Sequence, residues 1–433
     1  MRFIFYYLFQ SVFFIGLFLS SLSAAQAQDS LRAYTLEDIY QRVYQSNPSL
    51  MAAREALKER SEIYPQARSG WLPSINAETS VFGTRIENSN FNNADGTITK
   101  DFTVSVNQPI WRGGRTFAET KRANDLIEVA NAILQQAEQD IFLDTARAYI
   151  NVLRDRELLV LFKQNEKLLL KELESVKERQ YIGDITTTDV QQVQVRLLRA
   201  NADSLQASSN LDISNAQFKA LSDMKPPAKL IVPTTNIQPD INLNNMIMNA
   251  KQYNPAVTIA AFEHKASAHQ IDAIFGEMLP QVSAFTSYNF QLDPQPGIVD
   301  QSENQTLGIR ATMALYEGGS TRSRRREAKY ASKRKKYEMD DIQNQLTKDV
   351  IIHWRRYQTS QALVVSREEE VKVANNALAG VREEAKMGQR SIVNILDADE
   401  ELIDAKTALT RAKYDHFLTY YTLLNSVGTS PIK

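Results

Sequence analysis

The sequence predicts a mostly helical chain that is built twice over and that carries four β-strands of the membrane-spanning kind. Three observations support this fold class. The segment Gln108–Gly114 has a counterpart at Ala314–Gly319, and in both a pair of glycines follows an aromatic residue. Before each copy, apolar and polar residues alternate, as in a strand with one apolar face. After each copy, apolar residues recur every three or four positions, as in a long helix.

Each copy of this segment marks a switch from a strand to a helix. Glycine accepts backbone angles that other residues resist, which suits such a change. An aromatic ring two residues before the first glycine is typical of a position at a membrane surface. The predicted switch residues are Trp111, Gly113, Gly114, Tyr316, Gly318 and Gly319.

Other landmarks recur at nearly the spacing of the glycine pairs, which is 205 residues (318 − 113). Asn47-Pro48 recurs as Asn254-Pro255, and Gly183 recurs as Gly388. This period is far longer than that of solenoid repeats, so the chain is not an array of small units. We predict a first repeat over residues 28–224, a linker over 225–240, a second repeat over 241–427 and a tail over 428–433.

The first 27 residues have the features of a secretory signal peptide: Arg2, an apolar run over 3–22 and Ala25-Gln26-Ala27 as a cleavage site. The alternative is an uncleaved membrane anchor, because the apolar run is long for a signal. With 23% charged residues and a net charge of −1, the rest of the chain is expected to face water. The sequence contains no cysteine, which excludes disulfides, thiolate metal sites and a lipid-modified N-terminal cysteine.

Strands are predicted where apolar and polar residues alternate, at 74–84 and 102–107 in the first half and at 282–288 and 307–315 in the second. Loops are predicted over 86–99 and 291–303. Strands of about ten residues with one apolar face suit a barrel in the outer membrane, although a soluble sandwich alternates in the same way. Four strands cannot enclose a wide pore alone, so they form either a small sheet or part of a barrel shared by several chains.

In the last strand, Ile309, Ala311 and Met313 are predicted to face lipid, and Arg310 and Thr312 to face the lumen of a barrel. Phe285 is the exception to the pattern, because it falls on the polar face of its strand.

Helices account for most of the chain. Residues 35–68 are predicted to be helical, with Thr35 and Asp38 as a capping box and an interruption at Asn47-Pro48. Residues 117–180 contain neither proline nor glycine and predict a helix about 100 Å long. A second helix follows over 187–222, and the second half repeats the pair over 321–386 and 392–425. Helices of this length are typical of coiled coils, so each half is predicted to form a hairpin with its tip near Gly183 or Gly388.

The order of these elements resembles that of the TolC family of bacterial outer-membrane efflux ducts, over residues 35–427. The resemblance rests on the duplicated plan, the Asn-Pro landmarks, the Gly-Gly pairs and the tip glycines. It also rests on a recurring Leu-Pro landmark, Leu72-Pro73 and Leu279-Pro280. Its most specific segment is Gly388–Ala398. The resemblance implies an α-barrel of helical hairpins and a homotrimer, in which three chains give four strands each to one 12-stranded β-barrel.

The resemblance also implies a function. The expected activity is a channel of the outer membrane, with a periplasmic helical extension, that exports small molecules or proteins. The expected partners are a periplasmic adaptor, an inner-membrane pump or ABC transporter, and outer-membrane lipid, but not nucleic acid. The alternative is a periplasmic coiled-coil structural or adaptor protein that is anchored by its N-terminus.

Functional residues of the resembling family lie at the ends of the hairpins. The tips that dock the adaptor correspond here to Gly183, Asp184, Gly388 and Gln389. The acidic ring that narrows the tunnel corresponds to Asn394 and Asp397, of which only Asp397 is an acid.

A tie that holds the closed state in the family corresponds to Arg390 with Thr188 and Asp189. A second tie uses a tyrosine where this chain has Ala385. The alternative is that Arg390 and Asp189 are ordinary exposed charges, whose pairing contributes about 0–1 kcal/mol.

The sequence gives no sign of catalysis. Its four histidines, at 264, 269, 353 and 416, do not have the spacing of metal ligands. There is no phosphate-binding glycine loop and no visible pairing of a nucleophile with a base. We therefore predict no enzymatic activity, no cofactor and no metal.

Nine basic residues crowd between Arg322 and Lys336. They suggest a nucleic-acid surface, a solvated helical face, or contact with anionic lipid headgroups just below the strands. A secreted chain rarely meets nucleic acid, which favours the other two interpretations. The matching stretch near Lys121 is far less basic.

Overall fold

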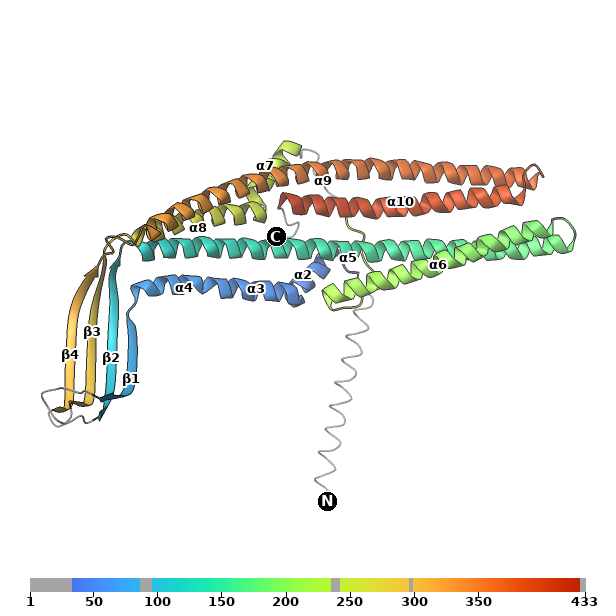
Figure 1. Ribbon diagram of the computed structural model, residues 1–433. Helices are drawn as coiled ribbons and strands as arrows, with labels where there is room; N and C mark the ends of the chain where they lie inside the picture. Colours follow the sequence, from blue (N-terminus) through green and yellow to red (C-terminus); the bar gives the residue numbers. More distant parts are fainter. Residues whose placement is uncertain (1–32, 86–95, 235–241, 296–298, 429–433) are drawn as a thin grey trace, which may run out of the picture. The chain divides into compact units, whose positions relative to one another are not determined.

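The computed structural model describes residues 33–85, 96–234, 242–295 and 299–428 (Figure 1). The predicted signal peptide, most of the tail and the end of the linker lie outside these residues. The described elements are α2 Leu36–Ser46, α3 Pro48–Ser61, α4 Ile63–Arg68, a 3-10 turn Ser69–Trp71, β1 Ser74–Arg85, β2 Gly96–Arg112, α5 Arg115–Tyr181, α6 Thr187–Ser222, α7 Leu243–Tyr253, α8 Pro255–Gly276, β3 Gln281–Gln295, β4 Val299–Thr312, α9 Ser320–Lys386 and α10 Ile392–Val427.

The second half of the chain repeats the elements of the first in order and in length. Helices α5 and α9 have 67 residues each, and α6 and α10 have 36 each. Both pairs begin 205 residues apart (320 − 115 and 392 − 187). The recurring Asn-Pro landmark has the same structural role twice, because Asn47 donates its side-chain amide to the carbonyl of Leu221 and Asn254 donates to that of Ser426.

The chain forms two compact units, and each unit draws on both halves of the sequence. The sheet unit comprises residues 53–135 and 255–344. Among the described residues, the hairpin unit comprises 33–52, 136–234, 242–254 and 345–428. Within the described residues, no helix is both long enough and apolar enough to cross a membrane.

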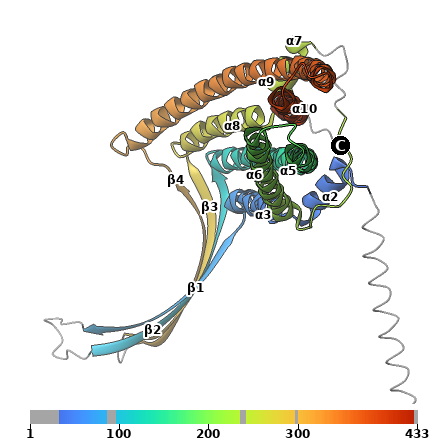
Figure 2. The same cartoon turned by 90° about the vertical axis from the view of Figure 1, so that its right-hand side faces the viewer.

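The sheet unit is built on four antiparallel strands in the order β1-β2-β3-β4 (Figure 2). Their register places the apolar residues of all four strands on one face: Ile75 pairs with Val106, Val106 with Thr286, and Thr286 with Leu307. Ile75 is 69% exposed and Leu307 is 83% exposed, so this apolar face is bare in a single chain. The outer edges of β1 and β4 have no strand partner among the described residues.

The structure explains why Phe285, an apolar residue, lies on the polar face of its strand. Phe285 lies opposite Gly308, and a Cβ on that glycine would come within 2.9 Å of the ring. The guanidinium of Arg310 lies 4.6 Å from the centre of the same ring. The missing side chain at Gly308 thus leaves room for an aromatic ring that Arg310 covers, and such cation–π contacts are favourable.

The strands are longer than the alternation predicted, at 12 to 17 residues. Strand β2 already begins at Gly96, and β3 continues to Gln295, so the predicted loops are too long. The backbone ladder continues through polar residues, where side-chain alternation gives no signal. Strand β4 ends at Thr312, so the prediction that Met313 and Leu315 belong to it is wrong.

The hairpin unit packs around aromatic and aliphatic residues from several helices. Its largest cluster joins Val43 of α2, Tyr149 of α5, Phe218 of α6 and Tyr421 of α10. Thr35 and Asp38 form the predicted capping box of α2. The segment 225–240, predicted to be a linker, contributes an isolated parallel bridge between Tyr34 and Leu230.

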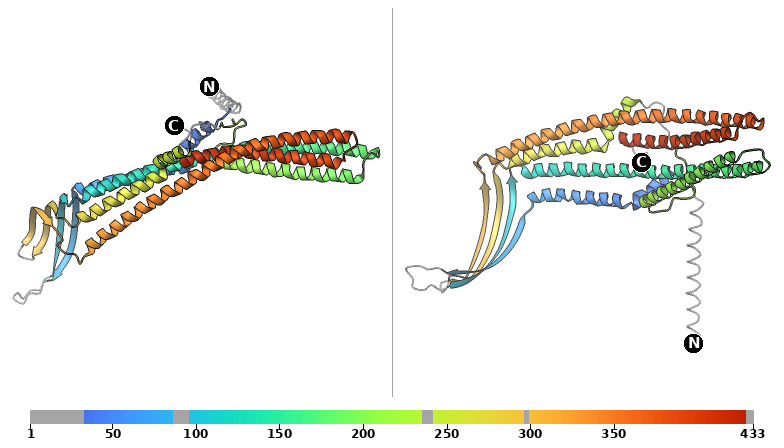
Figure 3. Two further views of the ribbon diagram at one scale, coloured as in Figure 1. Left: turned by 90° about the horizontal axis from the view of Figure 1, so that it is seen from above. Right: turned by 45° about the vertical axis from the view of Figure 1, so that its right-hand side comes forward.

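Two hairpins, α5–α6 and α9–α10, each turn back at a tight tip (Figure 3). The beginning of α10 packs on α5 and α6 through Ile392 and Leu396, which are buried among residues such as Val176 and Val193. Farther along α10, the Tyr414 hydroxyl donates to the Glu157 carboxylate at 2.8 Å. Apolar contacts near the tip and a polar contact farther away therefore hold α10 on the first hairpin.

Candidate functional site

The two hairpin tips have the same backbone structure. At the first tip, the amide of Gly183 donates to the carbonyl of Gln180, and that of Asp184 donates to Arg179. The second tip repeats both bonds, with Gly388 to Ala385 and Gln389 to Glu384. This is the pairing of a Schellman motif, which requires a left-handed residue after the helix. The two glycines supply it, with φ of +81° and +76°.

The side chains at both tips are exposed to solvent. Tyr181 is 93% exposed and Ile182 is 76% exposed, next to Gly183. Met387, next to Gly388, is 66% exposed. The adaptor-docking residues predicted from the sequence, Gly183, Asp184, Gly388 and Gln389, therefore lie at turns that present large apolar side chains to solvent.

At each tip an ion pair spans the turn, and these two pairs have opposite polarity. At the first tip, Arg179 precedes the turn and binds Asp184 at 2.7 Å. At the second tip, Glu384 precedes the turn and Arg390 follows it, also at 2.7 Å. All four side chains are about half exposed.

A capping box begins the returning helix after each tip. The backbone amide and hydroxyl of Thr186 donate to the Asp189 carboxylate at 3.0 and 2.7 Å. Hydrogen bonds from the Thr186 side chain, and then from its backbone, lower the pKa of Asp189. Ser391 donates in the same way to the side-chain oxygen of Asn394, at 3.2 and 3.0 Å. Asn394 therefore has the structural role in the second hairpin that Asp189 has in the first.

The other residue of the predicted gate, Asp397, has a basic partner. Arg196 of α6 donates from Nη2 to Asp397 at 2.5 Å, and its Nη1 contacts Glu400 one turn farther along α10. The Arg196 side chain is 21% exposed, and those of Asp397 and Glu400 are 57% and 48% exposed. Arg196 also lines a cavity of about 370 Å³, together with Thr188, Arg199 and Leu396.

The predicted tie of Arg390 to Thr188 and Asp189 does not form within this chain. Arg390 binds Glu384, Asp189 caps its own helix, and Thr188 lies at the cavity beside Arg196. Near the tips, the ion pair that joins the two hairpins is instead that of Arg196 with Asp397 and Glu400. Sequence reasoning missed Arg196 because its partner depends on how two hairpins, about 200 residues apart in sequence, are aligned.

The two strand-to-helix switches differ in their surroundings. All four glycines, Gly113, Gly114, Gly318 and Gly319, have positive φ. A Cβ on Gly113 would meet the carbonyl oxygen of Gly276 at 2.2 Å, whereas one on Gly318 would meet nothing within 4 Å. The aromatic residues Trp111 and Tyr316 are 46% and 86% exposed. The first switch is thus packed against the end of α8, and the second is open.

Among the described residues, no group of three or more His, Cys, Asp or Glu side chains could hold a metal ion. The arrangement offers two bare tips, a hairpin-to-hairpin ion pair and a sheet with one apolar face.

Comparison with known proteins identifies the family. A model of the outer membrane efflux protein family matches residues 39–222 and 246–429. The chain therefore belongs to this family of transport channels, which places it in the outer membrane.

Three similar proteins illustrate the match. The chain is 23% identical to the outer membrane efflux protein BepC of Brucella suis, over 91% of this chain and 85% of that protein. It is 22% identical to the outer membrane protein TolC of Vibrio cholerae, over 96% and 94% of the two chains. A solved structure of CusC, a transmembrane channel, covers 91% of this chain and 92% of its own with a TM-score of 0.81 at 13% identity.

Proposed function

We propose that three copies of this chain form one export duct of the outer membrane. The observation that carries the proposal is the four-stranded sheet, which has one bare apolar face and two outer edges without a strand partner in the described residues. In lipid, unpaired backbone groups at a sheet edge cost several kcal/mol each, so a sheet there must close. Edge β1 of one copy pairs with edge β4 of the next, and three copies close a ring of twelve strands.

The size of the assembly and its conductance test this proposal together. The full-length mature protein, purified in detergent, is expected to have the mass of a trimer and to open stable single channels in planar bilayers. A monomeric mass, or a bilayer that stays closed over many insertions, would contradict the duct. The matched control is the same preparation heated until the trimer dissociates.

The proposed duct works with a periplasmic adaptor and an inner-membrane transporter, and the hairpin tips are the docking surface. The exposed side chains of Tyr181, Ile182 and Met387 support this assignment, because exposed apolar groups at both tips mark a protein-binding surface. Gly388→Val and Gly183→Val are expected to block export with the trimer intact. Gly388→Asn is the control, because asparagine tolerates the left-handed conformation. Normal export by both valine variants would exclude the tips.

The proposed gate lies where the hairpins meet near their tips. A ring of Asp397 side chains carries at most three negative charges in a trimer, and the Arg196 of the same chain offsets each of them. We therefore expect weak cation selectivity, with Arg196 as the tie that holds α10 against α6 in the closed state. The tie between the two halves that was expected from the sequence, Arg390 with Thr188 and Asp189, stays a prediction.

Single-channel recording separates these assignments. Arg196→Gln is expected to raise both the conductance and the preference for cations, because it frees Asp397 and α10. Arg199→Gln is the matched control, since Arg199 lines the same cavity but has no ion pair among the described residues. Asp397→Asn is expected to lower the cation preference. Equal recordings from Arg196→Gln and Arg199→Gln would remove Arg196 from the gate.

The alternative function, a periplasmic coiled coil anchored by its N-terminus, predicts an uncleaved chain in the inner membrane. Cell fractionation with N-terminal sequencing distinguishes the two, because the duct predicts a cleaved chain in the outer membrane. The exported substrate requires a separate experiment. Deletion of the gene, followed by profiles of drug sensitivity and of secreted proteins, shows whether small molecules or proteins use the duct.

A further inference from the structure

Eight of the nine basic residues at the start of α9 fall into two sets in the structure, and the ninth, Arg334, binds Glu338 of the same helix. On the side that faces the rest of the sheet unit, the cations have partners: Arg324 binds Glu277 at 2.6 Å and Lys335 binds Glu263 at 2.8 Å. Arg325 lies 4.4 Å above the ring of Phe275. The other set is exposed and has no ion pair among the described residues. It consists of Arg322, Arg326, Lys329, Lys333 and Lys336.

The five exposed cations, which we call the basic stripe, share one face of α9. Their spacing of four, three, four and three residues places them in a row along the helix. The row covers about 20 Å of helix axis. Five like charges in one row repel one another, so the stripe calls for an anionic partner rather than only for water.

The first half of the chain has no such row. The equivalent positions, 205 residues earlier, are Phe117, Lys121, Asn124, Glu128 and Asn131. One lysine and one glutamate cancel there, and the Lys121 ammonium lies 4.3 Å over the ring of Phe117. The stripe is therefore a property of the second half alone and not a requirement of the shared helical fold.

The order of side chains along the chain points to the partner. Strand β4 exposes Leu307 and Ile309, at 83% and 73%. The connection that follows exposes Leu315 and Tyr316, at 89% and 86%, and Arg322 comes six residues later. Along the chain, apolar side chains are followed by an aromatic one and then by basic ones. This order matches the layers of a bilayer from its hydrocarbon core through the interface to the phosphates.

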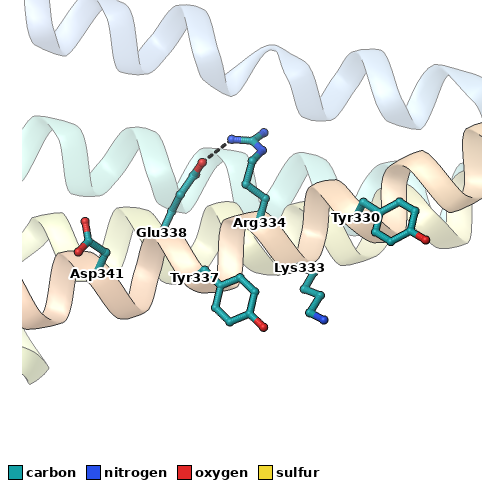
Figure 4. A pocket seen from close by; sticks show the side chains of 6 residues that line it. All are labelled: Tyr330, Lys333, Arg334, Tyr337, Glu338 and Asp341. Atoms are coloured by element: carbon teal, nitrogen blue, oxygen red, sulfur yellow. Dashed lines mark hydrogen bonds and ion pairs between the residues drawn. The ribbon is translucent and has the colours of Figure 1, made fainter.

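The far end of the stripe does not suit a phosphate. There, Lys333 and Arg334 border a hollow of about 560 Å³ that also contains Glu338 and Asp341 (Figure 4). Arg334 binds Glu338, and Lys333 lies 5.8 Å from the ring centre of Tyr337. Carboxylates at this end reduce the positive potential, so the first two turns of α9 are the anion-binding part.

A second copy of the chain is less suitable as the occupant. Under the proposed closure of the sheet, α9 would meet the helix that precedes β1 of the next copy. That helix, α4, and the turn after it contain a single charged residue, Arg68, which is also basic. Within this segment no carboxylate could neutralise Arg322 and Arg326, and the nearest carboxylates, Glu62 and Glu59, lie before its first residue.

We propose that Arg322 and Arg326 bind the phosphates of anionic lipid headgroups at the periplasmic surface of the outer membrane, with Lys329 adding to the local potential. The inference rests on the proposed membrane placement of the sheet. Long basic side chains reach toward headgroups while their stems follow the protein surface. The contribution of each cation is expected to fall with its distance along α9, because the surface potential fades within a Debye length.

Lipid retention tests the proposal in the full-length trimer. Protein purified in detergent is mixed with phosphatidylglycerol or with phosphatidylcholine, and the lipids that remain bound are counted by native mass spectrometry. The wild-type protein is expected to retain phosphatidylglycerol preferentially. The double variant Arg322→Gln/Arg326→Gln is expected to lose that preference by about tenfold. The double variant Lys333→Gln/Lys336→Gln removes the same amount of charge from the far end of the stripe. It is expected to keep most of the preference for phosphatidylglycerol.

Three other results would overturn the proposal. The first is equal retention of the two lipids by the wild-type protein, and the second is an equal loss in both double variants. The third is loss of the trimer in Arg322→Gln/Arg326→Gln, which would make the stripe a contact between copies.

Inorganic phosphate is tested as a competitor in the same experiment. Competition by phosphate at concentrations comparable to those of the lipid would indicate a site for the free anion. Conductance of the wild-type protein, measured in parallel, shows separately whether the duct itself fails.

Discussion

The two hairpin tips have one backbone and two opposite charge patterns. Both end in a Schellman motif on a glycine, with φ of +81° at Gly183 and +76° at Gly388. The ion pair across the first turn runs from Arg179 to Asp184, and that across the second runs from Glu384 to Arg390. The duplicated halves thus share the features that determine chain direction and differ in the side chains that determine charge.

The same contrast extends to the switches and to the returning helices. Gly113 and Gly318 have nearly equal φ, of +61° and +63°, but only Gly113 is packed against other atoms. His416 in α10 occupies the position of Leu211 in α6. Equivalent positions therefore allow each half to serve as the control for the other.

The largest expected difference between the halves is at the switches. Gly113→Ala forces a left-handed conformation on alanine and also pushes a Cβ into Gly276 and Leu279. Gly318→Ala has only the conformational cost, about 1–2 kcal/mol. We expect Gly113→Ala to cost about 2–5 kcal/mol, because overpacking adds to that term. Thermal unfolding of the two purified variants measures both costs, and equal Tm values would show that the first switch is not packed as described.

The strands are expected to respond alike in the two halves. Ile309 and its first-half counterpart Val104 lie on the apolar face of the sheet. Arginine at either position is expected to destabilise the assembled barrel by about 2–4 kcal/mol near the middle of the bilayer. Thr306→Arg is the control on the polar face, where a charge can meet water. Trimer yield in membranes reports the outcome, and a normal yield from Ile309→Arg would reverse the assignment of the faces.

A smaller difference is expected in acid. Burial lowers the pKa of His416, whose Nδ1 lies 2.9 Å from the Ser360 hydroxyl and whose ring stacks on Tyr357. The unfolded chain therefore binds more protons than the folded one just below the ordinary pKa of 6.5. Stability from this group is full above pH 6.5 and is lost as the pH falls through the folded pKa.

His416→Leu gives the second hairpin the residue of the first and is expected to flatten the dependence of Tm on pH below 6.5. Part of the slope is expected to stay, because burial also lowers the pKa of His353. An unchanged slope in His416→Leu would show that this side chain does not control the acid sensitivity of the second hairpin.

Much of the fold could be predicted from the sequence because local rules determine it. Glycine, proline and helical periodicity placed the ends of α5, α6 and α9 within a few residues. The strands were predicted too short, because a backbone ladder continues beyond the alternation of side chains. At Gly96 and Gln295 the alternation of apolar and polar residues has already ended, but the backbone still pairs with the neighbouring strand. The end of the alternation therefore does not mark the end of the strand.

The candidate site was only partly predictable. The tips at Gly183 and Gly388 follow from a local signal, since a glycine ends each long helix. The partner of Asp397 does not, because Arg196 reaches it only through the packing of one hairpin on another. The sequence contains a signal for the local role of Asn394. Ser391 is followed three residues later by this side-chain acceptor, which is the spacing of a capping box.

The smallest expected effects are those of the tip charges. Asp184→Asn and Arg390→Gln each break one half-exposed ion pair, and such pairs contribute about 0–1 kcal/mol. Added salt is expected to remove even this difference, because exposed charges are screened. By contrast, Gly183→Ala and Gly388→Ala are each expected to cost about 1–2 kcal/mol, since both put alanine in the left-handed region without a clash.

Thermal unfolding of these four variants, in low and in high salt, tests whether the tips share a backbone and differ only in charge. The two alanine variants are expected to lower Tm equally and independently of salt. The two charge variants are expected to have small effects that salt abolishes. Unequal costs at the two glycines would mean that the tips differ in backbone energetics, and the inverted ion pairs would then be part of how each turn is held rather than charges added to a common turn.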